Sequence, residues 1–173
     1  MTTHTRQGFT LVELMIYITI ISIFLVSAIQ FSVAVLQAGE KARIQTEVQQ
    51  NARFAMERIR REIRTADDVN TGASTFGAHP GVLSLAHDDV VSDPTIFDVS
   101  SGALRIKQGT GSPTNLTSSR VEVTNFVVQN RSVAGRTRNI QIQLTLSWAD
   151  EVATPFDTTI SLQSSVVIRE EED

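Results

Sequence analysis

A long uncharged stretch near the N-terminus constrains the fold of this chain more than any other feature. No charged residue occurs between Leu14 and Gly39, and residues 14–36 read LMIYITIISIFLVSAIQFSVAVL. About 20 apolar residues in a helix span the hydrocarbon core of a bilayer, so this run can cross a membrane. Positive charge favours the cytoplasmic side, and Arg6 precedes the run. We therefore expect the N-terminus inside and the C-terminal bulk outside.

Composition limits what the rest of the chain can do. Its 173 residues suffice for one core, and the net charge of −4 with a pI near 5.4 does not favour a nucleic-acid partner. There is no cysteine, which excludes a disulfide framework, thiolate metal ligands and a cysteine nucleophile. No HExxH, GxSxG or phosphate-loop pattern occurs, so we predict that the chain is not an enzyme and needs no cofactor.

The residues at the start of the apolar run carry a specific motif. Gly8-Phe9-Thr10-Leu11-Val12-Glu13-Leu14 follows a short polar leader that contains a basic residue. This pattern resembles the processing and methylation motif of type IV prepilins and type II secretion pseudopilins. The resemblance is close from residue 6 to about residue 36 and looser along the segment that follows.

The resemblance implies a maturation pathway. A prepilin peptidase would cut between Gly8 and Phe9 and methylate the new N-terminal Phe9, and Glu13 would be the acid needed for assembly. A charge at the bilayer centre costs about 2.5 to 3.5 kcal/mol, but Glu13 lies near the edge and near a helix N-terminus, where negative charge is favoured. By resemblance, the Phe9 amine of one subunit neutralises Glu13 of a neighbour in the filament core.

Two other readings of the N-terminus remain open. The apolar run could be a signal anchor for a monomeric extracytoplasmic binding domain, with Glu13 only capping the helix. It could also be a secretory signal peptide, because Val26-Ser27-Ala28 offers small residues for cleavage after Ala28. Glu13 interrupts the start of such a peptide, and the apolar character continues beyond Ala28 to Leu36.

The segment that follows the apolar run predicts an amphipathic helix. Apolar residues recur at spacings of three and four, which marks one buried face. They are Ile44, Val48, Ala52, Ala55, Met56, Ile59, Ile63 and Ala66. Glu57 and Arg61 stand four apart in the favourable order, and Arg58 and Glu62 in the weaker one. We expect one helix from Thr10 to Ala66.

The absence of proline in this helix separates the chain from one group of relatives. Many major pilins carry a proline partway along the apolar half, whereas residues 9–68 contain none. The only glycine between Phe9 and Asp68 is Gly39. We therefore expect a straighter helix and favour a minor pilin or minor pseudopilin.

Alternating apolar and polar residues predict β-strands after residue 67. Such alternation is typical of antiparallel sheets with one buried and one solvated face. The predicted strands are 82–86, 96–99, 103–107, 120–128, 139–148 and 159–168, with a turn at 100–102. A sheet with one apolar face needs the helix stripe as its cover, so the sequence predicts an α+β, pilin-like fold: a long N-terminal α-helix packed on a C-terminal antiparallel β-sheet.

These predictions give a domain plan. Residues 1–8 form the leader, 9–38 the transmembrane or filament-core half of the helix, 39–67 its amphipathic half, 68–168 the β-sheet domain and 169–173 an acidic tail. Carboxylates also gather in the loop 87–94, and although calcium binds such loops, the spacing does not fit an EF-hand and we predict no metal site.

The resemblance implies a structural subunit of a type IV pilus or type II secretion pseudopilus. The implied partners are the prepilin peptidase, other pilin or pseudopilin subunits through the N-terminal helix, the inner-membrane assembly platform and membrane lipid. The expected location is a single-pass cytoplasmic-membrane protein that later enters a cell-surface or periplasmic filament.

Overall fold

A computed structural model describes residue 8 and residues 10–133, 138–149 and 158–168. Its longest element is the helix α1, Leu11–Thr65. The chain divides into two compact units, residues 1–43 and residues 44–173. This division falls inside α1, five residues after the boundary at 38/39 that the sequence pattern suggested.

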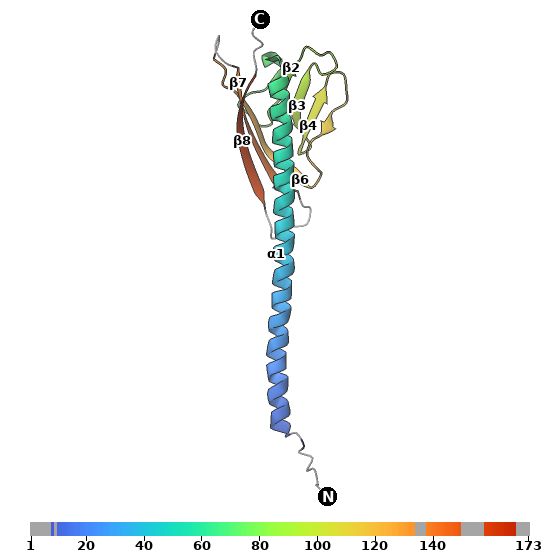
Figure 1. Ribbon diagram of the computed structural model, residues 1–173, viewed down its shortest axis with the longest axis vertical. Helices are drawn as coiled ribbons and strands as arrows, with labels where there is room; N and C mark the ends of the chain where they lie inside the picture. The colour runs from blue at the N-terminus through green and yellow to red at the C-terminus, as the bar shows by residue number, and fades with distance from the viewer. Residues whose placement is uncertain (1–7, 9, 134–137, 150–157, 169–173) are drawn as a thin grey trace. The chain divides into compact units, whose positions relative to one another are not determined.

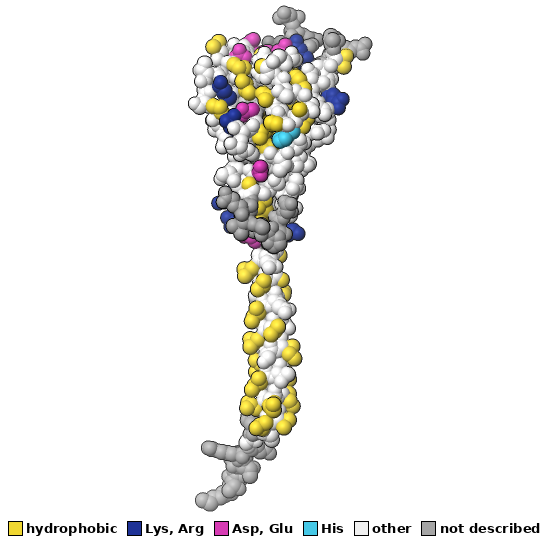
Figure 2. All heavy atoms as spheres, turned by 180° about the vertical axis from the view of Figure 1, so that it is seen from behind, with side chains coloured by type: hydrophobic (Ala, Val, Ile, Leu, Met, Phe, Trp, Pro, Cys, Tyr) yellow, Lys and Arg dark blue, Asp and Glu magenta, His cyan; other side chains and the backbone are white. Residues whose placement is uncertain are grey.

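The first unit contains a helical segment with no tertiary cover. From Leu11 to Arg43 all side chains are exposed except those of Glu13 and Ala28, which are half-buried. Figure 2 shows hydrophobic side chains along the visible face of the helix before it reaches the second unit, and residues 14–39 contain no charge. Since the backbone groups of a helix bond to each other, such a segment needs only an apolar surrounding.

In the second unit, the helix buries the predicted apolar stripe. Val48, Ala52, Ala55, Ile59 and Ile63 are fully buried. Ile44, Met56 and Ala66 are at most 6% exposed, so the whole predicted set is confirmed as core. Spacings of three and four place these side chains on one face of the helix, where both sheets meet them.

The first sheet has five strands in the order β1-β2-β3-β4-β5, all antiparallel. They are β1 (Asp68–Val69), β2 (Leu83–Ala86), β3 (Thr95–Ser100), β4 (Ala103–Gln108) and β5 (Thr114–Asn115), and a short 3-10 helix, Thr71–Ala73, follows β1. The turn between β3 and β4 has positive φ at Ser101 (50°) and Gly102 (73°), the geometry that suits a two-residue hairpin. The sequence predicted β2, β3 and β4 but missed the two-residue strands β1 and β5.

The second sheet has three strands in the order β6-β7-β8, also antiparallel. They are β6 (Val121–Asn130), β7 (Asn139–Trp148) and β8 (Thr159–Val167). The register of β6 shifts between Val123 and Asn125, whereas β7 and β8 pair without interruption. Alternation along β7, and on either side of the register shift in β6, places Phe126, Val128, Ile142 and Leu144 in the core.

The predicted α+β fold is confirmed, but the single predicted sheet is two sheets. Figure 1 shows them on either side of the C-terminal part of α1, and both contribute to one core with it. They do not join because a loop occupies the free edge of β6. Gly77 and Gly81 donate to the carbonyls of Val128 and Phe126, each at 2.8 Å. A Cβ on Gly81 would lie 3.0 Å from the Phe126 carbonyl oxygen, so this close approach favours glycine.

This packing predicts different costs for one substitution at two valines. Val128→Ala removes fully buried methyl groups and should lower the free energy of unfolding by about 2 kcal/mol. Val167→Ala, at a side chain that is 52% exposed, should cost less than about 1 kcal/mol. Denaturant unfolding of the full chain in detergent measures both. Equal costs would contradict the assignment of Val128 to the core.

Candidate functional site

The start of α1 is fixed by a capping interaction. Thr10 directly precedes the helix, and its Oγ1 accepts a hydrogen bond from the backbone N–H of Glu13 at 3.3 Å. The Thr10 carbonyl accepts the first helical bond, from the N–H of Leu14, at 3.2 Å. Thr10-Leu11-Val12-Glu13 therefore has the spacing of a capping box, in which a threonine satisfies an unpaired N–H of the first turn. The sequence contains this signal, although it was not recognised as one.

The Glu13 carboxylate lies in the first turn, where the helix dipole favours negative charge. The Tyr17 hydroxyl, one turn later, donates to Glu13 Oε1 at 3.4 Å, and the Glu13 side chain is half-buried. An ionised carboxylate has about four acceptor positions, and this long bond uses one of them. The group therefore keeps the capacity to accept from a cation of another molecule.

The other residues predicted for this site are described only in part. Gly8 is exposed, and nothing lies within 4 Å of a Cβ built on it. Phe9 and the leader residues 1–7 lie outside the described residues, as does the tail 169–173. The structure thus places Glu13 at the helix start, with Gly8 accessible before it, and does not describe Phe9.

Four hydroxyl residues of the apolar segment satisfy their hydrogen bonds within the helix. The hydroxyls of Thr19, Ser22, Ser27 and Ser32 each donate to the carbonyl four residues earlier, at 2.7 to 2.9 Å. A hydroxyl that bonds within its own helix needs no partner in lipid. Within the described residues, α1 is the helix long and apolar enough to cross a membrane; its most apolar window has a mean hydropathy of 2.4 and is not buried in the protein.

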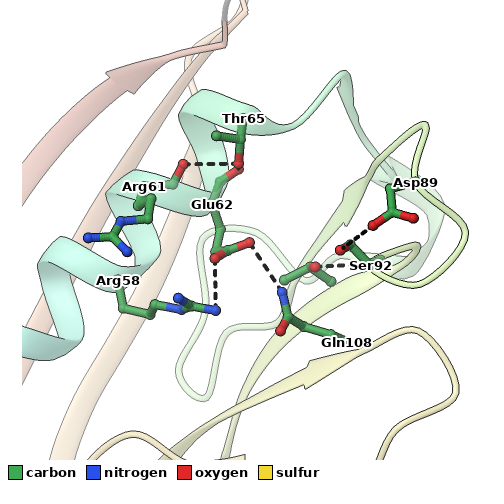
Figure 3. Close-up of polar contacts among 8 residues, drawn as sticks. Arg58, Arg61, Glu62, Thr65, Asp89, Ser92 and Gln108 are labelled. Atoms are coloured by element: carbon green, nitrogen blue, oxygen red, sulfur yellow. Dashed lines mark hydrogen bonds and ion pairs between the residues drawn. The ribbon is translucent and has the colours of Figure 1, made fainter.

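A buried carboxylate at the other end of α1 was not anticipated as core. Glu62 is 7% exposed and lies beside Ile63 at the margin of the apolar stripe. Arg58 Nη2 lies 3.0 Å from Glu62 Oε1, and Gln108 Nε2 on β4 donates to Glu62 Oε2 at 3.4 Å. Figure 3 shows both side chains pointing toward Glu62 from two elements. This polar contact joins the helix to the five-stranded sheet.

Other charges near this end of the helix form surface pairs. Glu57 lies 3.9 Å from Arg60 instead of contacting Arg61, with both side chains exposed. On the sheet, Asp98 and Arg105 form a two-bond fork at 2.9 and 2.6 Å across β3 and β4. The hydrogen bonds that Arg105 donates to the Asp98 carboxylate raise the pKa of Arg105 above its ordinary value. These pairs order the surface but do not gather into a reactive cluster.

The acidic loop 87–94 uses its carboxylates to hold its own backbone. Asp89 accepts from the N–H of Val91 and from the Ser92 hydroxyl, both at 3.1 Å. Asp93 accepts from the N–H of His87 at 3.2 Å. In the part of the chain that the structure describes, no three His, Asp or Glu side chains gather as metal ligands would. The bonds to Asp89 and Asp93 therefore explain why carboxylates gather in this loop.

Comparison with known proteins adds one finding at the N-terminus. A family model described as the prokaryotic N-terminal methylation motif matches residues 3–29, which include Gly8, Phe9 and Glu13. No curated protein and no solved structure matches the chain. The motif and the long apolar helix packed on antiparallel sheets together support a protein of the type IV pilin or pseudopilin kind. They also fit a protein anchored in a membrane by a single span.

The buried contact predicts that replacing Glu62 lowers the free energy of unfolding more than replacing Glu57, another glutamate of α1. Glu62→Ala leaves the Arg58 guanidinium and the Gln108 amide without this acceptor, and should lower the free energy of unfolding by about 1 to 3 kcal/mol. Glu57→Ala, at a 63% exposed side chain five residues earlier, should change it by less than about 0.5 kcal/mol. Thermal unfolding of the full chain in detergent compares them. Similar losses would show that Glu62 has no special role in holding helix and sheet together.

Proposed function

We propose that this chain is a prepilin-like precursor of a filament subunit. A prepilin peptidase removes residues 1–8 by cutting after Gly8 and methylates the amine of Phe9. Residues 9–38 then anchor the subunit in the cytoplasmic membrane and later line the filament core, with residues 39–67 and 68–168 outside. The observation that supports this most is the coincidence of the methylation motif with an uncovered apolar helix that begins at Leu11. In this role the chain is a substrate of the peptidase and not an enzyme.

Glu13 is the assembly acid in this proposal. Its carboxylate is held by one long bond from Tyr17 and keeps acceptor positions open. The methylated amine of Phe9 stays basic, and the amine of a neighbouring subunit supplies the cation that an acid in an apolar surrounding requires. A buried ion pair adds little net stability, but it fixes register between chains. The pair therefore sets how far one subunit is displaced along the next.

Two features support a minor role in the filament: the absence of proline from the helix and the exposed loops of the two sheets. Residues 9–68 contain no proline, unlike those of many major pilins. The two sheets expose loops such as 87–94 that could contact partners at a filament tip. We propose a tip or priming component of a type IV pilus or a type II secretion pseudopilus, assembled by the inner-membrane platform. Counting this chain against the other subunits of purified filaments tests the assignment, since equal abundance with the main subunit would exclude it.

Processing predicts a defined N-terminus. The protein purified from its own cell membrane should begin at N-methylated Phe9, because Gly8 is accessible and the motif surrounds it. Intact mass and N-terminal sequencing decide this. A chain that begins at Met1 would be a signal-anchored domain, and one that begins at Ile29 would be a secreted domain; either result contradicts the proposal.

The proposed ion pair predicts that assembly depends on the carboxylate of Glu13. Glu13→Val should reduce recovery in sheared filaments by about ten-fold or more, because losing one partner of a buried ion pair costs several kcal/mol. Membrane anchoring should persist, since the apolar span is unchanged. Glu40→Val, at an exposed glutamate of the same helix, is the matched control and should assemble normally. Normal assembly of Glu13→Val would rule out the proposed ion pair.

A further inference from the structure

The two edges of the three-stranded sheet differ in their cover. At the β6 edge, Gly77 and Gly81 donate to backbone carbonyls of the strand. His79 Nδ1 accepts from the N–H of Phe126 at 2.9 Å, so the same loop also satisfies a donor. The loop 77–81 therefore covers this edge from Phe126 to Val128, and further along the strand Val123 donates to the Gly102 carbonyl at 2.8 Å.

The β8 edge has no such cover among the described residues. Ile168 donates to the Arg138 carbonyl at 2.9 Å, and Trp148 donates to the Thr158 carbonyl at 3.1 Å. These two bonds, with an unbroken register, show that even-numbered residues of β8 bond to β7. The backbone groups of the odd-numbered residues point away from β7: Thr159, Ser161, Gln163, Ser165 and Val167. No backbone hydrogen bond joins these groups to another described residue.

The composition of β8 leaves this edge unprotected. Natural edge strands are usually short, charged, bulged or interrupted by proline, which prevents pairing with other chains. β8 is nine residues long and regular, and its sequence TISLQSSVV contains no charge, proline or glycine. In a chain with 20% charged residues, a long uncharged edge indicates that the strand is meant to pair.

The side chains of β8 define what an added strand would present. Ile160 and Leu162 point to the core face, where they are only partly buried beside it. Thr159, Ser161 and Gln163 occupy the opposite face. A strand that alternates apolar and polar residues would cover the first set and match the second.

We propose that the free edge of β8 accepts an extended strand from a neighbouring pilin-like subunit, an inference that rests on the proposed filament function. Main-chain hydrogen bonds to the outward groups would supply affinity, and the alternating side chains would supply register. The contact continues the three-stranded sheet from one subunit into the next.

A second copy of β8 is excluded as an antiparallel partner by symmetry. Two copies of β8 that pair antiparallel are related by a two-fold axis normal to the sheet. The helical segment 44–65 packs on the face of this sheet, so the same rotation would reverse its direction. Subunits that enter one membrane in the same orientation cannot be related in this way. An antiparallel added strand must therefore come from a different segment of the neighbouring subunit.

Hydrogen exchange tests the edge directly. Assembled and detergent-isolated full-length protein are exchanged in D2O, quenched and read by NMR. The outward amides of β8, at odd positions 159–167, should exchange freely in the isolated chain and about ten-fold or more slowly when assembled. The even positions 160–166 should be protected in both states. Equal rates at the odd positions in both states would overturn the proposal. Protection already present in the isolated chain would do the same, because a segment of this chain would then cover the edge.

A proline pair gives the second test. Gln163→Pro removes an outward N–H and should leave the isolated fold intact, whereas Gln163→Ala keeps that N–H. Assembly of Gln163→Pro should fall by about ten-fold or more and that of Gln163→Ala should not. Normal assembly of the folded Gln163→Pro variant would overturn the proposal. If that variant does not fold, the hydrogen-exchange experiment decides. The mature N-terminus of each sample is sequenced, so that a failure of processing is distinguished from a failure of strand addition.

Discussion

The apolar stripe from Ile44 to Ala66 is the contact on which the second unit depends. Two sheets converge on it, and buried residues of both sheets share one core cluster with it. Because the hydrophobic term grows with the apolar area removed from water, this one strip of side chains holds together strands that do not pair with each other. Glu62 adds a directional contact, because the hydrogen bond that it accepts from Gln108 on β4 favours one rotation of the helix against that strand. The ion pair with Arg58 lies within the helix.

Most of the fold could be predicted because its signals are local and periodic. The spacing of Ile44, Val48 and Ile59 sets one helix face, and the alternation in 139–148 sets a strand whose bounds the structure reproduces. The division into two sheets could not be predicted. It depends on Gly77 and Gly81 reaching the β6 edge, a contact between residues more than forty positions apart that leaves no period in the sequence. The strands β1 and β5 were missed because two residues cannot show an alternation.

Some features of the candidate site could likewise be predicted from the sequence, and others could not. The motif around Gly8 and Glu13 can be recognised in the sequence because it is a linear segment, which the family model matches at residues 3–29. The capping bond that Thr10 accepts from Glu13 was also present in the sequence as a spacing, and it explains locally why the helix starts where it does. The contact of Tyr17 with Glu13 and the open edge of β8 could not be predicted from the sequence. Each depends on the direction in which a group points and not on the type of residue that carries it.

The hydroxyls that bond back along the apolar segment have a consequence for movement between environments. Thr19, Ser22, Ser27 and Ser32 keep the same hydrogen bonds whether lipid tails or the side chains of other helices surround them. Passage from one apolar surrounding to another therefore exchanges no hydrogen bonds at these positions. A change of apolar surroundings would thus act more strongly on the first turn of the helix, because the Glu13 carboxylate there has one long described bond and an acid in an apolar medium requires a partner.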